Sequence, residues 1–435
     1  MTPLTASANC INYPWRRRDA PAYTDFSARP RPTPRLKQMT DQSDPHLFPP
    51  ERGFPESEFA ERTQRMQTAM RALEVDGLLL TTEAEIRYFS GFHTQFFESP
   101  TRPWFLVVPA HDRPIALIPE IGASGMTATW IEDIRTWPSP RPEDDGVSLL
   151  ANTLKELPQR FGRVGVPMGQ ETLLRMPVTD YRSLADKVRP IEFIDAAALM
   201  HQLRFIKSKR EIEKIRYVCQ LTSAAFTALP SAIQTGETER DICRSLRIDL
   251  LQRGADSCPY IVAGSGPGGY DSIIMGPTDR IPSSGDVLII DTGTTFDGYF
   301  CDFDRNFAFE SLSDASRKAH EVVHHATDAG FAAARPGATT TDVWSAMWSV
   351  LEAGGALGNS VGRMGHGLGM QLTEWPSVRA GDDTPLAPGA ILTLEPGMTF
   401  APGQQLVHEE NIVITEEGAE YLTVRAPLEM PVVKD

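Results

Sequence analysis

Apolar residues follow a helical spacing in the first part of the chain. Phe59, Met66, Met70 and Leu73 lie close to the 3.6-residue period, which predicts a helix over 56–73. Short apolar runs and further periodic segments then alternate, and we expect strands at 77–81, 104–108 and 114–119 and helices at 148–157 and 178–188. This alternation up to about residue 195 predicts an α/β domain.

The pattern changes after residue 195. A continuous helical pattern covers 196–229, and we interpret its charged run 207–213 as a solvated helix start at a domain boundary. Asp297-Gly298 is a dipeptide that favours a hairpin turn between two strands. We expect helices at 238–253, 313–334 and 341–353 and strands at 287–290, 299–309, 390–394 and 411–415. Hairpins with separate helices predict an α+β domain.

The length of 435 residues exceeds the usual size of one domain. We therefore expect two domains, at 56–200 and 201–435, after a disordered extension at 1–55 that is rich in Pro, Arg, Ser and Thr. No apolar stretch follows Arg16, Arg17 and Arg18, so the extension does not resemble a secretory signal. Met39 is an alternative initiator.

Charge and cysteine usage exclude several classes of protein. The net charge of −15 disfavours binding to nucleic acid or to an anionic membrane, because both require a positive surface. Five cysteines without a CxxC pair favour reduced thiols and a cytoplasmic location over a disulfide framework. No apolar run approaches the roughly 18–20 residues of a membrane span.

Two glycine-containing motifs resemble known functional motifs, but we do not assign the corresponding functions to them. Gly264, Gly266 and Gly269 satisfy GxGxxG, but Pro267 and the glycines after it disfavour the helix start that dinucleotide binding needs, so we expect a glycine-rich loop. Asp291-Thr292-Gly293-Thr294 resembles an aspartic-protease loop. That chemistry needs two such loops, and a single one would require a symmetric dimer.

The segment His320-Glu321-Val322-Val323-His324 satisfies the zinc motif HExxH on a predicted helix. One extended form of this motif requires Gly at 327 and a third ligand, His, at 330, where the chain has Thr327 and Gly330. Another form requires a Glu ligand near position 344, where the chain has Trp344. We therefore interpret the two histidines as a polar surface face of the helix.

Paired carboxylates on one hairpin give a more specific signal. Asp291 and Asp302 lie on the two strands predicted around Asp297-Gly298. Antiparallel pairing can bring two such side chains together on one face. Adjacent carboxylates repel unless a proton or a cation lies between them, and divalent metals suit an oxygen-rich ligand set.

Three later residues complete a candidate ligand set. His366 stands among glycines, where the backbone can approach closely. Glu395 ends an apolar strand, and Glu409 precedes another. Each of these signals is weak by itself.

Together the residues resemble the metal site of the pita-bread family, which includes prolidase, aminopeptidase P, methionine aminopeptidase and creatinase. The first two aspartates stand eleven residues apart, as in that family, and the resemblance covers about residues 57–435. The matching motifs are Asp-x-Gly and Gly-Tyr-x-x-Asp at Asp291, Gly293, Gly298, Tyr299 and Asp302, His-x-x-Gly at His366 and Gly369, Glu-Pro-Gly at Glu395–Gly397, and the closing acid Glu409.

The resemblance implies an α/β creatinase-like domain before an α+β pita-bread catalytic domain that holds two divalent ions of Mn, Co, Zn or Fe. Asp291 would bind one metal, Asp302 and Glu409 would bridge both, and His366 and Glu395 would bind the second. A metal-bridging water would attack the substrate, with Glu395 as general base. The implied reaction is hydrolysis of an amide or Xaa-Pro-type C–N bond in a small substrate.

The sequence departs from the proline peptidases at three positions. Ile274 and Thr373 replace two helper histidines of the family, and Val407 replaces an arginine. These changes argue against true proline-peptidase activity. They leave open a metal-dependent lyase, a non-peptide C–N hydrolase and a non-catalytic pita-bread binding protein.

Substrate contacts are expected at side chains that could line the site. The partners implied are a small molecule or short peptide and a second copy of the chain, whose segment 89–105 would close the pocket of its neighbour. The candidates for substrate binding are Phe97, Tyr270, Thr373 and Trp375. For the aromatic residues Phe97, Trp104, Tyr270 and Trp375, packing in the core or at an interface is the favoured interpretation over substrate contact.

Overall fold

A six-stranded mixed sheet with the order β4-β3-β2-β1-β5-β6 organises the first domain of the computed structural model. The structure describes residues 48–234, 236–358 and 362–434, so the expectations for residues 1–47, Met39 included, lie outside it. The strands are β1 Gly77–Leu80, β2 Phe105–Pro109, β3 Ile115–Pro119, β4 Asp133–Trp137, β5 Arg163–Val166 and β6 Glu192–Asp195. The helices are α1 Glu56–Leu73, α2 Glu83–Ser90, α3 Ala123–Thr127, α4 Val147–Glu156 and α5 Val178–Lys187, with short 3₁₀ turns at Gln95–Glu98 and Glu120–Gly122.

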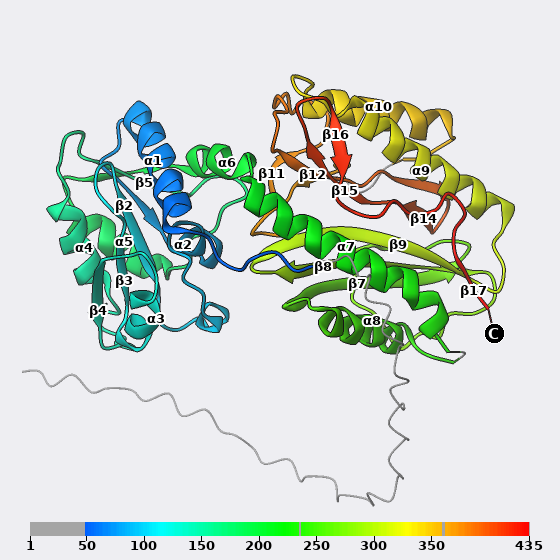
Figure 1. Cartoon of the computed structure of the whole chain (residues 1–435), viewed down its shortest axis with the longest axis horizontal. Coiled ribbons are helices and arrows are strands. Elements are labelled where there is room, and N and C mark those ends of the chain that lie inside the picture. The colour runs from blue at the N-terminus through cyan, green and yellow to red at the C-terminus, as the bar shows by residue number, and fades with distance from the viewer. Residues whose placement is uncertain (1–47, 235, 359–361, 435) are drawn as a thin grey trace, which may run out of the picture. The chain divides into compact units, whose positions relative to one another are not determined.

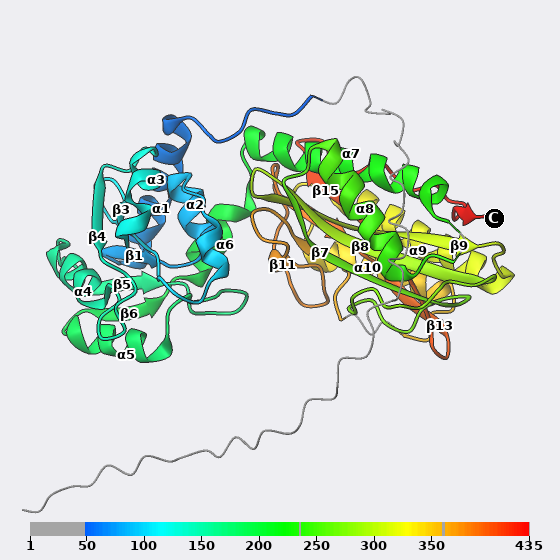
Figure 2. The ribbon, with the colours of Figure 1, turned by 90° about the horizontal axis from the view of Figure 1, so that it is seen from below.

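Helices cover both faces of this sheet (Figures 1 and 2). Leu78 and Leu80 pack with the apolar residues of α1, α2 and α3, whereas Leu79 packs with those of α4 and α5. Alternate side chains of a strand point to opposite faces, so β1 is apolar throughout because both faces are buried. The α/β expectation for this domain is confirmed.

The helical pattern predicted over 196–229 is two helices, α6 Ala197–Phe205 and α7 Lys209–Ala232. Ser208 caps α7, and its side chain and that of Glu211 bond each other's backbone N–H groups. The charged run was predicted to be solvated, and this is wrong for Lys207 and Glu211, which are buried, whereas Lys209, Arg210 and Glu213 are exposed as predicted. Lys207 pairs with Glu374, and Glu211 accepts a hydrogen bond from Tyr299.

The second domain is built on the sheet β17-β9-β8-β7. Strands β8 Asp286–Phe296 and β9 Tyr299–Phe309 join through Asp297 and Gly298, both with positive φ, as the hairpin prediction required. Gly264 and Gly266 lie in β7 Ser257–Pro267, so the expected glycine loop is partly strand. Gly266 must be glycine because a Cβ there would meet Gly269 O at 2.4 Å.

A five-stranded sheet of order β11-β10-β12-β15-β16 and the hairpin β13-β14 complete the domain. Figures 1 and 2 show α7 and α8 on the side of β7, β8 and β9, with α9 and α10 on the side of β12 and β15. No helix among the described residues is both long and apolar enough to cross a membrane. The remaining elements are α8 Glu239–Arg253, α9 Asp314–Ala333, α10 Thr340–Ala353, β10 His366–Gly367, β11 Glu374–Ser377, β12 Ile391–Leu394, β13 Gly397–Ala401, β14 Gln404–Val407, β15 Glu410–Ile414, β16 Ala419–Tyr421 and β17 Val432–Val433.

Candidate metal centre

The β8–β9 ladder brings aspartates together on one face of the sheet. Asp291 lies opposite Asp304, and Asp302 lies opposite Gly293, two positions further along the ladder. Residues two apart on a strand share a face, so Asp291, Asp302 and Asp304 point the same way. Gly293 has no side chain to fill this space, and a Cβ there would meet Leu372 Cδ1 at 2.3 Å.

His366 enters this cluster from β10. Its Nδ1–H donates to the carbonyl of Gly367 at 2.8 Å, which leaves Nε2 as the free nitrogen, 3.4 Å from Asp302 Oδ2. The neighbouring glycines are required because a Cβ would approach Thr393 O to 2.1 Å at Gly365 and Trp375 O to 2.3 Å at Gly367. Burial lowers the pKa of His366, which favours the neutral imidazole that metals bind.

Glu395 and Glu409 flank the same space at the ends of two paired strands. Glu395 follows β12, and its backbone N–H donates to Met364 O at 3.1 Å. Glu409 directly precedes β15, which pairs with β12. One ligand atom each from Asp302, His366 and Glu409 lie within 4.8 Å of one another. The structure therefore brings Asp302, His366 and Glu409 together, with Asp291 and Glu395 close enough for their charges to repel that of Asp302.

The acids of this cluster lack the partners that buried charges need. Burial raises the pKa values of Asp291, Asp302 and Glu409 well above the ordinary range, and mutual repulsion adds to the shift at Asp291 and Glu409. Asp291 Oδ1 and Glu409 Oε1 are buried without a hydrogen-bond partner among the described residues. Carboxylate oxygens without a hydrogen-bond partner, beside a free imidazole nitrogen, fit divalent cations. Bound cations would offset the repulsion between the carboxylates and would replace the missing hydrogen bonds.

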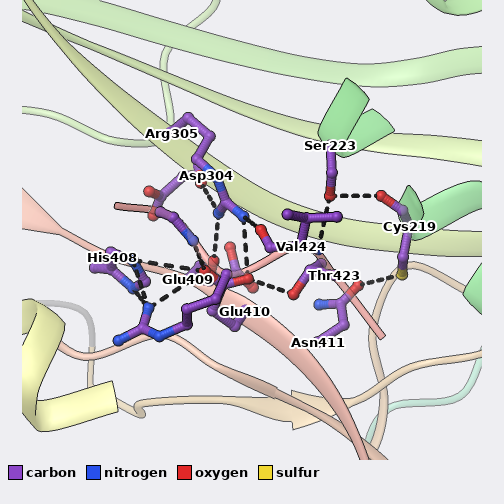
Figure 3. Close-up of polar contacts among 12 residues, drawn as sticks. Cys219, Ser223, Asp304, Arg305, His408, Glu409, Glu410, Asn411, Thr423 and Val424 are labelled. Atoms are coloured by element: carbon purple, nitrogen blue, oxygen red, sulfur yellow. Dashed lines mark hydrogen bonds and ion pairs between the residues drawn. The ribbon is translucent and has the colours of Figure 1, made fainter. Parts of the chain in front are cut away.

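A network of buried side chains holds the ligand-bearing strands (Figure 3). Arg305 donates to the carbonyl oxygens of Asp304 at 2.7 Å and Glu409 at 2.9 Å, and to Glu410 Oε2 at 3.0 Å. Asn411 Oδ1 accepts from Asp302 N at 3.0 Å, and its amide nitrogen donates to Asp302 O. The network fixes β9 against β15, so the ligands are oriented by their backbones.

The expected substrate contacts divide into two groups. Phe97 packs against Trp104 in the core of the first domain, and Tyr270, 1% exposed, bonds Val407 N and Asn306 Oδ1. The expectation of substrate contact is therefore wrong for Tyr270 and unsupported for Phe97, because packing uses their surfaces. Thr373 and Trp375 remain partly accessible, Trp375 stacked on His201 beside a cleft.

Three residues of the site were missed from the sequence. Tyr260 lies on β7, and burial together with the charge of Asp291 raises the pKa of its phenol. Glu171 lies in a loop of the first domain and accepts from Ser377 Oγ at 3.3 Å. Arg363 Nε lies 3.8 Å from Glu395 Oε1. Tyr260, Glu171 and Arg363 stand in no recognisable motif, because their positions at the site depend on tertiary packing.

The HExxH histidines were expected on a surface face, and this is wrong. His320 and His324 are 4% and 8% exposed, and their rings lie 6.2 and 5.1 Å from that of His408. Arg425 donates to the ring of His408 at 2.8 Å, so a cation already adjoins the cluster. A positive charge there disfavours a zinc ion, and the motif remains structural.

Two family models match separate parts of the chain. The creatinase/prolidase N-terminal domain matches residues 62–206, and metallopeptidase family M24 matches residues 213–417. The chain is 29% identical over 374 residues to the probable dipeptidase PepE of Mycobacterium tuberculosis, across 85% of this chain and 95% of the relative. It is 24% identical over 369 residues to an Xaa-Pro dipeptidase of Pyrococcus furiosus, across 83% and 97%.

Solved structures give the same result. The crystal structure of the dipeptidase PepE from Mycobacterium ulcerans superposes with a TM-score of 0.76 at 26% sequence identity. The match covers 88% of this chain and 100% of PepE. The prolidase from Pyrococcus horikoshii has a TM-score of 0.72 at 21% identity, covering 84% and 99%, and it supports the fold alone. The match of residues 213–417 to metallopeptidase family M24 and of residues 62–206 to the creatinase/prolidase N-terminal domain confirms the resemblance to the pita-bread family, and the protein is a metal-dependent hydrolase.

Proposed function

We propose that the protein is a dinuclear-metal dipeptidase that cleaves the C–N bond of short peptides other than proline peptides. The observation that carries the proposal is the convergence of Asp302, His366 and Glu409 within 4.8 Å, beside orphaned oxygens of Asp291 and Glu409. The names of the relatives, probable dipeptidase and Xaa-Pro dipeptidase, support a peptide substrate.

Each ligand has a proposed position in the centre. Asp291, Asp302, His366, Glu395 and Glu409 would together hold the two ions. The short distance from His366 Nε2 to Asp302 Oδ2, 3.4 Å, supports a shared ion between these two side chains. When bound, the ions supply Lewis acidity for the scissile carbonyl and acidify the attacking water.

Glu395 is the proposed general acid–base. Its side chain is 16% exposed, against 7% for that of Asp302, so it can face substrate. It accepts a proton from the attacking water and then delivers it to the nitrogen of the departing amino acid. Hydrolysis then yields two amino acids from a dipeptide.

A reconstitution experiment tests this function. Metal-free protein is loaded with Mn, Co, Zn or Fe, bound metal is counted by mass spectrometry, and a panel of dipeptides and small amides is assayed. We expect two ions per chain and dipeptide hydrolysis, both lost in Asp302→Asn. Asp279→Asn is the matched control, since its side chain is 83% exposed in a surface ion pair. One ion per chain, or cleavage of amides alone, contradicts the proposal.

Other properties follow as proposals. We expect Mn, Co, Zn or Fe because the donor set is four carboxylates and one imidazole. A cytoplasmic location is supported by Cys219, Cys243, Cys258 and Cys301, all free and buried.

We propose domains at 56–200 and 201–435. We also propose a homodimer in which segment 89–105 covers the partner's site. The 40% exposure of Phe96 supports the dimer, and light scattering tests it.

A further inference from the structure

Three side chains of helix α9 form a second cluster of potential metal ligands, outside the candidate metal centre. His324 stands four residues and His325 three residues before Asp328, and side chains at these spacings are neighbours on a helix. One ligand atom from each of the three residues lies within 4.8 Å of the other two. The helix therefore assembles two imidazoles and a carboxylate without help from a distant strand.

The distances inside this cluster suit a tetrahedral ion. Nδ1 of His324 lies 3.5 Å from Asp328 Oδ2, and Nδ1 of His325 lies 3.8 Å from the same oxygen. Zinc holds imidazole nitrogen and carboxylate oxygen at about 2.0–2.2 Å, so two ligands of a tetrahedral ion stand about 3.4 Å apart. The side chains of His325 and Asp328 are 58% and 48% exposed, so water can complete the coordination.

The ring of His324 is oriented for such an ion. Its Nε2–H donates to the carbonyl oxygen of Ala426 at 3.1 Å, which leaves a lone pair on Nδ1. This Nδ1 is buried and has no hydrogen-bond partner among the described residues. A lone pair that faces a carboxylate oxygen needs a proton or a cation between the two atoms. Burial and the charge of Arg425 lower the pKa of His324, which disfavours the proton and favours a metal cation.

Arg425 both supports the cluster and limits its affinity. The guanidinium donates to Asp328 Oδ1 at 2.8 Å, so the carboxylate meets the two imidazoles through Oδ2. Partners of this kind orient metal-binding carboxylates. At His408 the same guanidinium bonds the imidazole directly, whereas beside His324 its charge is paired with a carboxylate. The remaining repulsion makes this site weaker than the metal centre, so we expect it to fill only when metal exceeds two ions per chain.

We propose that His324, His325 and Asp328 form a further site for a divalent cation that prefers imidazole ligands, such as Zn²⁺, Cu²⁺ or Ni²⁺. Two nitrogen ligands favour these ions over Mn²⁺. The site is independent of the proposed dipeptidase function. Because His324 bonds Ala426 and Asp328 bonds Arg425, a bound ion ties α9 to the segment that follows β16. Binding to the folded state alone stabilises that state.

Equilibrium dialysis of the zinc-loaded protein against rising free zinc tests the site. We expect the unaltered protein to bind one more ion per chain than His325→Ala, whose side chain is exposed and can be removed without loss of the fold. The affinity lost in His325→Ala should exceed about 10- to 100-fold, the effect of losing only a residue that orients a ligand. Excess zinc should also raise the urea midpoint of the unaltered protein more than that of His325→Ala.

The matched control is His93→Ala. The side chain of His93 is 54% exposed and lies 3.0 Å from Glu83 Oε1, but no third ligand joins this pair among the described residues. The control should therefore keep both the further ion and the shift of the urea midpoint.

The alternatives give different results. Equal zinc binding by the unaltered protein and His325→Ala would overturn the proposal, because Asp328 would then serve Arg425 alone. Loss of the further ion in both histidine variants would overturn it as well, since exposed histidines in general would then bind zinc. Loss of all zinc in His325→Ala would assign His325 to the fold and reject the site. A further ion lost only in His325→Ala, without dipeptide hydrolysis, would reject the proposed function and retain the site, and hydrolysis without a further ion would do the reverse.

Discussion

The side-chain amide of Asn411 bonds both backbone groups of Asp302. Its Oδ1 accepts from Asp302 N at 3.0 Å, its nitrogen donates to Asp302 O, and Oδ1 also accepts from the thiol of Cys219 at 3.3 Å. Asn411 is fully buried, so no water can replace these bonds. A candidate metal ligand on β9 is thus held by a residue of β15 that lies 109 residues later in the sequence.

We predict that Asn411→Ala weakens metal binding about 10- to 100-fold, the usual effect of losing a residue that orients a ligand. The substitution leaves the N–H and C=O of Asp302 unpaired in the interior, at a cost of about 1–3 kcal/mol each in the free energy of unfolding. Metal titration and urea denaturation measure the two effects. Asn152→Ala, at an exposed site on α4, should change neither. Unchanged metal affinity in Asn411→Ala would show that Asp302 needs no such support.

Exhaustive chelation should abolish activity, and added divalent metal should restore it. Turnover that survives chelation would indicate metal-free chemistry.

The variant Glu395→Gln should retain the fold, because the amide is nearly isosteric, and should lower kcat by about 10²–10⁴ through loss of acid–base catalysis. Weaker metal occupancy is also expected, so kcat is measured at saturating metal. Glu417→Gln, at an exposed position, is the control. A near-normal rate in Glu395→Gln would show that this residue takes no part in the mechanism.

Burial lowers the pKa of His320 to about 4, which makes the fold sensitive to acid. In the unfolded chain histidine protonates near pH 6.5, whereas folded His320 stays neutral down to about pH 4. The native state therefore binds fewer protons, and the stability it contributes above pH 6.5 is lost as the pH falls to about 4. The full loss is about 3 kcal/mol. Burial also lowers the pKa values of His324 and His408, which adds to the effect.

We predict that His320→Gln loses less free energy of unfolding than the unaltered protein between pH 6.5 and 4. Denaturation of metal-free protein at several pH values measures this, since acid would otherwise also release metal. His325→Gln, with a side chain 58% exposed on the same helix, should follow the unaltered protein. Parallel curves for all three proteins would mean that His320 is already protonated or accessible in the folded state.

Local patterns in the sequence predicted the elements and the ligand set but not the packing around them. The hairpin at Asp297-Gly298 was readable because its turn type depends on two adjacent residues. The break between α6 and α7 was overlooked although Ser208 and Glu211 form a capping box, a signal weaker than the apolar period that runs across it. Periodicity fixed the helix of His320 but not its burial, because the covering residue, His408, lies on a distant strand.

The groups around the metals show the same limit. Asp291, Asp302, His366, Glu395 and Glu409 stand in short motifs whose backbone requirements leave a trace in the sequence, such as glycines on both sides of His366. Arg363 has no such motif. Its position at Glu395 depends on the pairing of Met364 with Val378 and on the path of β12, which no local pattern encodes.

The last prediction concerns proline peptides, which this enzyme should cleave poorly. Ile274 is 76% exposed and has no polar side-chain atom, and Val407 is buried and apolar. Thr373 offers one hydroxyl, and Arg363 already donates to it. His408, the remaining imidazole beside a ligand, bonds Thr327 and Arg425 and lies edge-on to His324 of α9, so it faces away from substrate.

Losing one positioned transition-state hydrogen bond typically costs about 2.7–4 kcal/mol, or roughly 10²–10³ in rate. With two such bonds missing, matched pairs of Xaa-Pro and Xaa-Ala dipeptides should differ strongly in kcat/KM, with alanine preferred. Saturating Mn, Co or Zn excludes incomplete metal loading as the reason for slow cleavage. A kcat/KM of about 10⁴ M⁻¹s⁻¹ or more on any Xaa-Pro dipeptide or tripeptide, within the ordinary enzyme range, would refute the prediction. Such a result would mean that another group positions the proline substrate, with Tyr260 the first candidate because its phenol lies against Asp291.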